Sequence, residues 1–291
     1  MFGELMGMQA GCCEAHLIYD LHAHSNASDG NLSPEALVAR AVERGVQVLA
    51  LTDHDTTGAL ARASLAAAES GLVLIPGIEF STQWMGRGIH VVGLNIDPAH
   101  PTLQAGIATQ LELRNLRAEQ IAHKLSKMNV KDSLVGAQQL AGDAVIGRPH
   151  FAQYLVNAGY APHFAGAFKK YLGAGKPGDV KQCWPEMATV IGWITAAGGI
   201  AVLAHPDKYE MTRTKLCNLV QAFREAGGRA LEVVSGKQLP GVAEKLAAIA
   251  NQFGLLASCG SDFHVPNQPW QELGAFGKLP SSCEPVWHAW Q

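Results

Sequence analysis

The chain has 291 residues, of which 48% are hydrophobic and 16% charged, so it can bury a core and is neither disordered nor collagen-like. At about 150 residues per domain this length allows two domains, although one α/β barrel can use all of it. Its 22 Lys and Arg against 25 Asp and Glu give a net charge of −3, which excludes a protein that coats duplex DNA with a basic surface.

The first hundred residues alternate between predicted strands and helices. Strands are predicted at 17–21, 47–51, 72–75 and 89–94. A helix is expected to begin at Pro34, with Ser33 as its cap, and to end before Gly45. A second, alanine-rich helix covers about 58–70, and Pro76 and the turn 86–88 separate the last two strands.

The pattern becomes helical from residue 101 to about residue 183. Helices are predicted at 103–128, 133–140, 150–158 and 163–171, and a glycine-rich loop follows at 173–178. Alternation resumes with strands at 200–204, 230–234 and 255–258. We therefore expect an α/β body, formed by residues 16–99 and 184–291, with a helical insertion at 100–183.

Two features bear on the compartment. The first Lys or Arg is Arg40, so the N-terminus lacks the basic start of a signal peptide, and the uncharged segment 187–204 contains a glycine pair that predicts a helix end and not a membrane span. Six scattered cysteines without a CxxC pair favour a reducing compartment. We expect a cytoplasmic protein without membrane contact.

Imidazole and carboxylate side chains recur where the predicted strands end. The set is His22, His24, Asp29, His54, Glu79, His90, His205, Asp262 and His264. In an α/β barrel the carboxyl ends of the strands share one rim, so we expect these groups to converge. A donor set without cysteine suits Mn²⁺, Zn²⁺ or Fe²⁺, and it is large enough for two or three ions with Glu79 as a bridge. Asp53, beside His54, is expected to orient a ligand or to cap a turn.

These residues lie in motifs that resemble those of the PHP (polymerase and histidinol phosphatase) family. The motifs are Asp20-Leu-His-Ala-His24, Asp29-Gly30, Leu51-Thr-Asp-His-Asp55, Gly77-Ile-Glu79, His90-Val-Val-Gly-Leu94, Ala204-His-Pro206 and Gly260-Ser-Asp-Phe-His264. The resemblance implies a distorted (β/α)7 barrel of α/β class. It also implies three ligand sets, which are His22, His24, Glu79 and Asp262; Asp29, His54 and His264; and Glu79, His90 and His205.

The insertion resembles one subgroup of that family, the 3′,5′-nucleotide bisphosphate phosphatases and 5′→3′ exoribonucleases of the RNase AM type. The resemblance rests on the segments 147–151, 168–172 and 175–178. It implies that Arg148 and Lys176 bind phosphate and that His150 contacts the same phosphate or caps a helix. Lys208 follows His205-Pro206 where the subgroup often has arginine, so we expect Lys208 to face the substrate.

The expected charge of the metal site indicates the chemistry independently of the resemblance to the PHP family. Three divalent ions carry more charge than Asp29, Glu79 and Asp262 neutralise, so the pocket attracts anions. Water between two such ions ionises near neutral pH, which favours phosphoester hydrolysis with Glu79, Asp262 and His264 as catalytic residues. We expect Mn²⁺ as the metal, with Zn²⁺ or Fe²⁺ as alternatives.

The predicted substrate is a phosphorylated nucleotide or an RNA 5′ end. The enzyme would release the 3′-phosphate of 3′,5′-bisphosphonucleotides, or remove 5′-phosphorylated nucleotides from RNA in the 5′→3′ direction. The alternatives left open are a histidinol-phosphate-type phosphatase, a C–N amidohydrolase on the same metal site, and a non-enzymatic metal-stabilised binding module. The oligomeric state stays open.

Overall fold

The computed structural model describes residues 17–180 and 184–290. One sheet of seven strands follows the order of the sequence from β1 to β7. The strands are β1 (Tyr19–Asp20), β2 (Val48–Leu51), β3 (Val73–Trp84), β4 (Arg87–Leu94), β5 (Ile200–Leu203), β6 (Ala230–Ser235) and β7 (Leu256–Gly260). Every strand that the sequence predicts is therefore present.

The sheet curves into a nearly closed barrel in which one strand is reversed. Strands β1 to β3 are parallel, β4 is antiparallel to both neighbours, and β5 to β7 are parallel again. The two edge strands meet where the amide of Leu21 donates to the carbonyl of Cys259 at 3.0 Å. The predicted fold class, a distorted (β/α)7 barrel with a helical insertion, is confirmed.

The prediction that the third strand stops at Pro76 is wrong, because β3 continues to Trp84. Pro76 is the last residue of β3 to pair with β2, and from Gly77 onward β3 pairs with β4. Proline lacks an N–H but can still accept, and its carbonyl takes a hydrogen bond from the amide of Ile96 at 3.1 Å. Met85 and Gly86, both with positive φ, form the hairpin turn.

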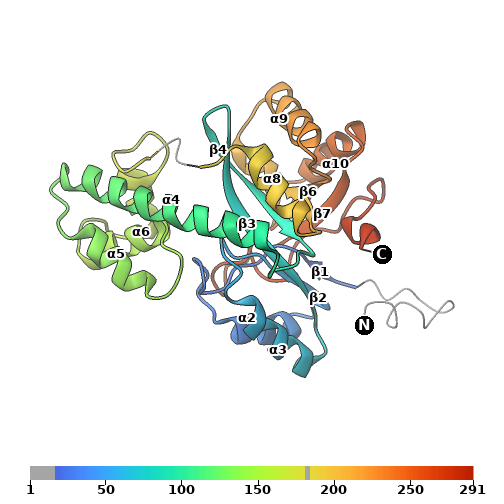
Figure 1. Cartoon of the computed structure of the whole chain (residues 1–291), viewed down its shortest axis with the longest axis horizontal. Coiled ribbons are helices and arrows are strands. Elements are labelled where there is room, and N and C mark those ends of the chain that lie inside the picture. Colours follow the sequence, from blue (N-terminus) through green and yellow to red (C-terminus); the bar gives the residue numbers. More distant parts are fainter. Residues whose placement is uncertain (1–16, 181–183, 291) are drawn as a thin grey trace.

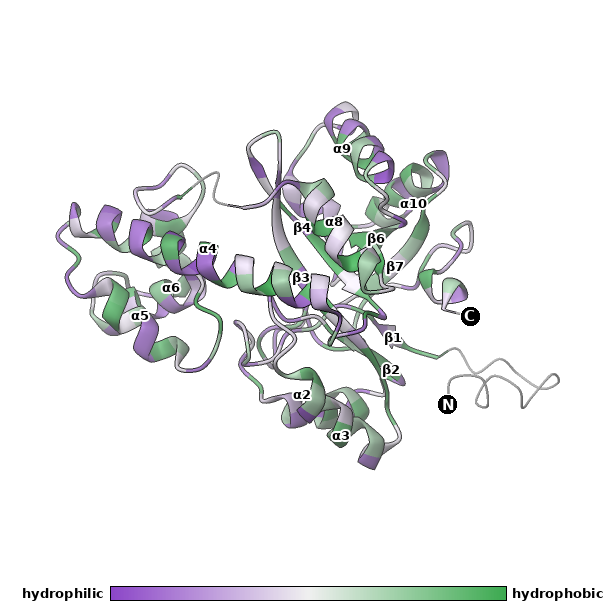
Figure 2. Ribbon diagram, in the orientation of Figure 1, coloured by the Kyte–Doolittle hydropathy of each residue, from purple (hydrophilic) through white to green (hydrophobic). Residues whose placement is uncertain are grey.

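Helices flank the strands on opposite sides in Figure 1. The helices of the barrel are α2 (Pro34–Glu43), α3 (Leu60–Ser70), α8 (Met187–Ala196), α9 (Arg213–Glu225) and α10 (Val242–Gln252), with short turns η2 (Pro206–Tyr209) and η3 (Val286–Ala289). The predicted cap is present, since the hydroxyl of Ser33 accepts from the amide of Ala36 at 3.2 Å. In Figure 2 the strands are mainly green, whereas α9 and α10 mix green and purple, as expected for helices with one face on a core.

The segment between β4 and β5 is helical, as predicted. It contains α4 (Pro101–Ser126), α5 (Ser133–Ala141), α6 (Arg148–Asn157), α7 (Phe164–Ala167) and the π-helical turn η1 (Phe168–Leu172). The first half of α4 packs on the barrel, where Gly106 leaves room for the ring of Trp193. The second half extends away from the strands and covers a separate core that includes Leu125, Phe151 and Leu155.

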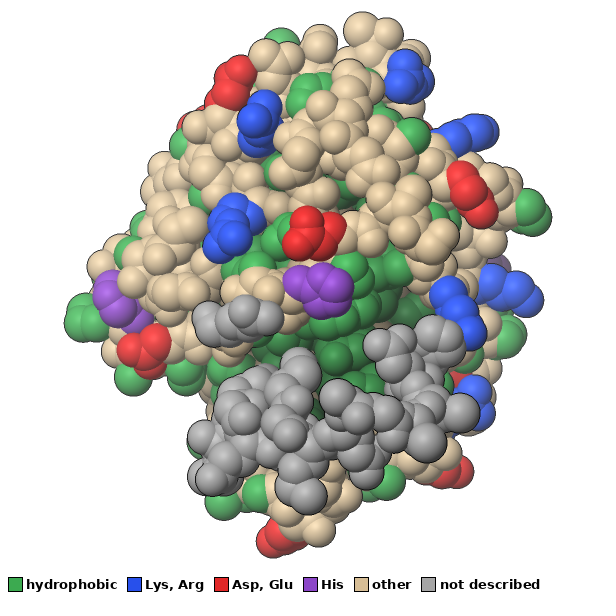
Figure 3. Space-filling model, turned by 90° about the vertical axis from the view of Figure 1, so that its right-hand side faces the viewer, with side chains coloured by type: hydrophobic (Ala, Val, Ile, Leu, Met, Phe, Trp, Pro, Cys, Tyr) green, Lys and Arg blue, Asp and Glu red, His purple; other side chains and the backbone are tan. Residues whose placement is uncertain are grey.

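The described residues include no membrane-spanning helix, and the face drawn in Figure 3 shows no belt of basic side chains. No helix within the described ranges combines the length and the apolar character that a membrane crossing needs. On the face shown in Figure 3, the Lys and Arg side chains drawn in colour are scattered and interspersed with Asp and Glu. This distribution agrees with the net charge of −3.

Candidate functional site

The structure brings all of the predicted imidazole and carboxylate groups together at one end of the barrel. Each of them lies within 4 Å of another member of the set. Most follow the carboxyl ends of parallel strands, as expected. His90 lies near the start of β4, opposite Ser81, and it reaches the same rim because β4 runs in the reverse direction.

Glu79 and Asp262 share two imidazoles in the first predicted ligand set. The Oε2 atom of Glu79 lies 3.3 Å from Nε2 of His22 and 3.2 Å from Nε2 of His24. The Oδ1 atom of Asp262 lies 3.5 and 3.4 Å from the same two nitrogens. Two carboxylate oxygens and two imidazole nitrogens thus face one small volume, and Oε2 is the oxygen that Glu79 contributes to it.

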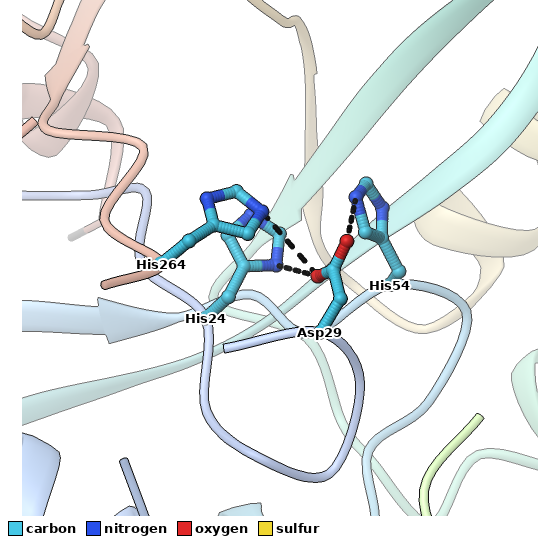
Figure 4. Close-up of side chains that lie close together, drawn as sticks. All are labelled: His24, Asp29, His54 and His264. Atoms are coloured by element: carbon cyan, nitrogen blue, oxygen red, sulfur yellow. Dashed lines mark ion pairs between the residues drawn. The ribbon is translucent and has the colours of Figure 1, made fainter. Parts of the chain in front are cut away.

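Asp29 occupies the centre of the second set. Figure 4 shows its carboxylate between the imidazoles of His24, His54 and His264. The shortest of the three contacts joins Oδ1 of Asp29 to Nε2 of His264 at 3.3 Å, and the contacts with His24 and His54 are 3.9 and 3.8 Å. The loop that carries Asp29 is held by Asp53, whose carboxylate accepts from the amide and hydroxyl of Ser25 at 2.8 and 2.6 Å.

The third set surrounds the other oxygen of Glu79. Its Oε1 atom lies 2.9 Å from Nδ1 of His90 and 3.1 Å from Nε2 of His205. His54 belongs to the second predicted set but also contacts Glu79, since its Nδ1 lies 3.0 Å from Oε2, and its ligand atom is close enough to share an ion with Glu79 and His90. Glu79 therefore contacts imidazoles through both oxygens, which is the arrangement that a bridging ligand needs.

The donor set fits divalent metal ions. Among the described residues, several buried side-chain atoms at this site have no hydrogen-bond partner. They are Nε2 of His22, Nδ1 and Nε2 of His24, Nδ1 of His54 and Oε2 of Glu79. Unpaired buried polar atoms are costly and rare, and a cluster of lone-pair donors relieves that cost by coordinating cations. Three groups of these residues have ligand atoms close enough to hold an ion.

The charges of Glu79, Asp262 and His54 suit this role. Burial alone raises the pKa of Glu79 and of Asp262, but contacts with histidines, and with Lys208 at Asp262, hold the pKa of both well below the usual range. Burial lowers the pKa of His54 well below its usual value, which favours the neutral imidazole that binds metals. Burial also lowers the pKa of His24, but Asp262 and Glu79 raise it to about 10, so a cation there competes with a proton.

Glu232 orients one of the ligands and was missed by the sequence analysis. It lies on β6, is 2% exposed, and its Oε1 is 2.9 Å from Nδ1 of His22. Its other oxygen accepts from the amide of His205 at 2.5 Å. The contact between Glu232 and Nδ1 of His22 fixes the ring of His22 with its Nε2 atom toward the cluster. A single carboxylate inside the apolar strand 230–234 was the signal that could have identified it.

The predicted substrate-binding residues fall in different places. Arg148 lines a cavity of about 520 Å³ beside the cluster. His150 caps the start of α6, since its Nδ1 accepts from the amide of Gly147 at 3.0 Å. Lys176 is exposed on the loop 173–178 and does not line the cavity, and Lys208 forms an ion pair with Asp262.

The cavity also contains cationic and aromatic residues that the sequence analysis did not select. Asp29, His54 and His90 form its boundary with the cluster, and Arg87, Arg114, Arg117 and Trp184 line other parts. The guanidinium carbons of Arg114 and Arg117 lie 5.4 and 5.1 Å from the centre of the Trp184 ring. Their spacing on α4 gave no functional signal, because arginines on a long amphipathic helix are usually solvated.

We predict that the purified protein binds at least two transition-metal ions per chain. The expectation follows from the three groups of ligand atoms that share Glu79, His24 and His54. Elemental analysis of the protein, loaded with Mn²⁺ and freed of excess ion, measures the stoichiometry. A fully active protein with one ion or fewer per chain would contradict the bridging assignment of Glu79.

Comparison with known proteins gives consistent matches over most of the chain. A family model described as PHP domain matches residues 20–234. The 5′-3′ exoribonuclease Rnm of Escherichia coli is 49% identical over 94% of this chain and 94% of its own length. The 3′,5′-nucleoside bisphosphate phosphatase of Chromobacterium violaceum is 42% identical over 92% of this chain and 94% of its own.

Solved structures share the fold. A Chromobacterium violaceum protein, solved as an amidohydrolase with bound sulfate and no metal, has a TM-score of 0.87 at 42% identity and covers 93% of this chain and 95% of its own. A Bifidobacterium adolescentis protein assigned to the metal-dependent phosphoesterases has a TM-score of 0.77 at 27% identity, with 93% of both chains covered.

Proposed function

Because the chain belongs to the PHP domain family, we propose that it is a metal-dependent phosphoesterase that acts on phosphorylated nucleotides. The observation that carries the proposal is the junction of two features, a cluster of buried metal-ligand atoms and a cavity lined by arginines that opens onto it. The cluster supplies the site of hydrolysis, and the cavity supplies a place for a second anionic group of the same substrate.

We assign the nine predicted ligands to two or three divalent ions, with Mn²⁺ as the preferred metal. The ligands are His22, His24, Asp29, His54, Glu79, His90, His205, Asp262 and His264. Imidazole and carboxylate donors without thiolate support Mn²⁺, and also accommodate Zn²⁺ or Fe²⁺. Bound ions supply Lewis acidity and water activation near neutral pH. The role of the chain is to hold its carboxylates as anions and its imidazole nitrogens toward one volume.

We assign the substrate wall to the insertion, residues 100–183. Arg114 and Arg117 of α4 and Arg148 of α6 line the cavity, together with Trp184, which follows the insertion. A volume of about 520 Å³ is in the range of small-ligand sites and suits one nucleotide. An arginine fork matches a phosphate in two-point contact, so we place the terminal phosphate at Arg148. Contacts from Lys176 and His150 stay predictions.

The proposed reaction removes the group attached to the 3′ oxygen of the nucleotide in the cavity. Water adds to phosphorus, the bond from phosphorus to the 3′ oxygen breaks, and that oxygen leaves with a proton. With a 3′,5′-bisphosphonucleotide the products are inorganic phosphate and the 5′-monophosphate. With a 5′-phosphorylated RNA they are the same mononucleotide and a shortened RNA with a new 5′-phosphate, so one site serves both relatives' named substrates.

The alternative readings give different products. A C–N amidohydrolase would release ammonia from amides, and the solved relative that carries this designation has bound sulfate, an anion shaped like phosphate. A histidinol-phosphate-type phosphatase needs no binding site for a second phosphate. A binding module without activity does not need the full set of predicted ligands, and in this chain all nine side chains lie together. The described cysteines, Cys217, Cys259 and Cys283, are free, which supports a reducing compartment and our assignment to the cytoplasm.

We predict that adenosine 3′,5′-bisphosphate is hydrolysed with a kcat/KM at least ten-fold above that of adenosine 3′-monophosphate. The remote 5′-phosphate contributes binding energy that positions the reacting group, and one charged contact typically contributes about 1.5–3 kcal/mol. Phosphate release by the Mn²⁺-loaded protein measures both values. Two kcat/KM values that agree within a factor of about two would reject a separate binding site for the 5′-phosphate.

Arg148→Ala tests whether Arg148 forms the binding site for the 5′-phosphate. The variant is expected to reduce the preference for the bisphosphate to about two-fold while the metal content stays unchanged. Lys169→Ala is the matched control, because Lys169 is an exposed cation of the same insertion that does not line the cavity. An unchanged preference in Arg148→Ala would mean that Arg148 does not bind the 5′-phosphate.

A further inference from the structure

The arginine-lined cavity borders only one side of the ligand cluster. Asp29, His54 and His90 contribute to its lining, whereas Asp262 and His205 do not. A phosphodiester joins two nucleotides, and a cavity of about 520 Å³ suits one of them. A longer RNA must therefore leave the cluster over a different surface, and the residues around Asp262 are the candidates for it.

Asp262, which does not line the cavity, is flanked by a cation and an amide. The ammonium of Lys208 forms an ion pair with Oδ2 of Asp262. The side-chain amide of Gln271 donates to the same oxygen at 3.2 Å and to the carbonyl of Asp262 at 2.8 Å. The segment that carries Gln271 is thus fixed against a proposed metal ligand.

An exposed aromatic residue adjoins this contact. Trp270, next to Gln271, is 55% exposed, so much of its side chain is accessible to a ligand. Its carbonyl accepts from the amide of Lys237 at 2.8 Å, which joins the loop after β6 to the loop after β7. The approach is close enough that Gly236, with φ +57, has no room for a Cβ beside that carbonyl. We call the exposed edge formed by the loops after these two strands the β6–β7 rim. It consists of Lys237, Trp270 and Gln271, together with Lys208 of η2.

The same edge contains buried polar atoms without partners. The hydroxyl of Ser235, at the end of β6, and both amide atoms of Gln238 are buried and lack hydrogen bonds within the described part of the chain. Ser235 lies two residues before Lys237, and Gln238 follows it directly. Unpaired buried donors and acceptors are costly, so a segment that contains several of them is a candidate for contact with a polar ligand.

We propose that the β6–β7 rim binds the nucleotide that follows the scissile phosphate in 5′-phosphorylated single-stranded RNA, with Trp270 stacked on its base. The proposal rests on the proposed function, because it assumes that the first nucleotide occupies the cavity. Lys208 and Lys237 supply positive charge for the backbone, and base–aromatic stacking tolerates any sequence. After hydrolysis the new 5′-phosphate stays on the RNA held at the rim, while the released mononucleotide leaves the cavity.

The test compares two substrates that differ only beyond the scissile phosphate. Adenosine 3′,5′-bisphosphate ends there, and a 5′-phosphorylated penta-adenylate continues over the rim. Trp270→Ala is expected to lower kcat/KM for the pentanucleotide about ten-fold and to change that for the bisphosphate by less than a factor of two. Trp270→Phe keeps an aromatic face and is expected to restore most of the pentanucleotide activity.

Leu65→Ala, which truncates an exposed apolar residue of α3, is the control for a surface change away from the rim. Equal losses on both substrates would show that Trp270 acts only through Gln271 and Asp262, and no loss on either would remove the rim from the RNA path. Both results overturn the inference while leaving the proposed function intact. A wild-type protein that cleaves neither substrate would instead reject the proposed function itself.

Discussion

Asp262→Asn is expected to lower kcat/KM for adenosine 3′,5′-bisphosphate at least about 10³-fold, which corresponds to about 4 kcal/mol of transition-state stabilisation. The change removes one anionic donor beside His22 and His24 and leaves a neutral amide near Lys208. Asn retains the shape of Asp and also tolerates the left-handed backbone at this position, where φ is 54°. Phosphate release and thermal unfolding, measured on the same samples, separate activity from stability.

Asp97→Asn is the matched control. Asp97 is exposed and follows β4, the reversed strand, so it lies outside the ligand cluster. We expect that variant to keep wild-type activity. If Asp262→Asn retained more than a tenth of the activity, Asp262 would not be an essential ligand. If the variant lost its fold together with its activity, Asp262 would be a structural residue.

Arg114→Ala is expected to lower the free energy of unfolding by about 3–5 kcal/mol. The side chain of Arg114 is 7% exposed, and its Nε donates to Oδ2 of Asp55 at 2.6 Å. It also donates to the hydroxyl of Ser81 at 3.1 Å and to the carbonyl of Ile146 at 3.3 Å. Truncation leaves the carboxylate of Asp55 buried without its cation, which costs more than the intact pair contributes.

The expected loss corresponds to a fall in Tm of roughly 10 °C. Arg114→Lys keeps the charge but not the fork, and is expected to recover part of the loss. Glu112→Ala changes an exposed side chain of the same helix and controls for helix propensity. A change below about 1 kcal/mol in Arg114→Ala would mean that the packing of α4, and not this ion pair, joins the insertion to the barrel.

The pair also bears on the site, because Asp55 follows His54. Asp55 has a left-handed backbone with φ 54°, and its amide donates to the carbonyl of Glu79 at 2.9 Å. Its second oxygen, Oδ1, accepts from the amide of Ser81 at 2.8 Å. The insertion thus contacts, through Arg114, the backbone that holds two of the proposed ligands.

The sequence predicted the elements and the ligand cluster because both follow from local pattern. Alternating strands and helices identify an α/β barrel, and in such a barrel residues at strand ends must meet. His22 and His24 follow their strand with one residue between them, so both can face one side. For the same reason the motifs that resemble those of the PHP family are recognisable in the sequence alone.

Tertiary structure alone decided which partners surround the cluster. Glu232 contacts His22 across 210 residues of sequence, Arg114 contacts Asp55 across 59, and Lys208 contacts Asp262 across 54. No local pattern encodes such pairs, because they depend on how β6, α4 and η2 pack against other strands. The same holds for the cavity, which includes Arg148 but not Lys176, since the backbone of the loop 173–178 determines where that lysine lies. Position along a strand is a local property, whereas the neighbour that a side chain meets is a property of the whole fold.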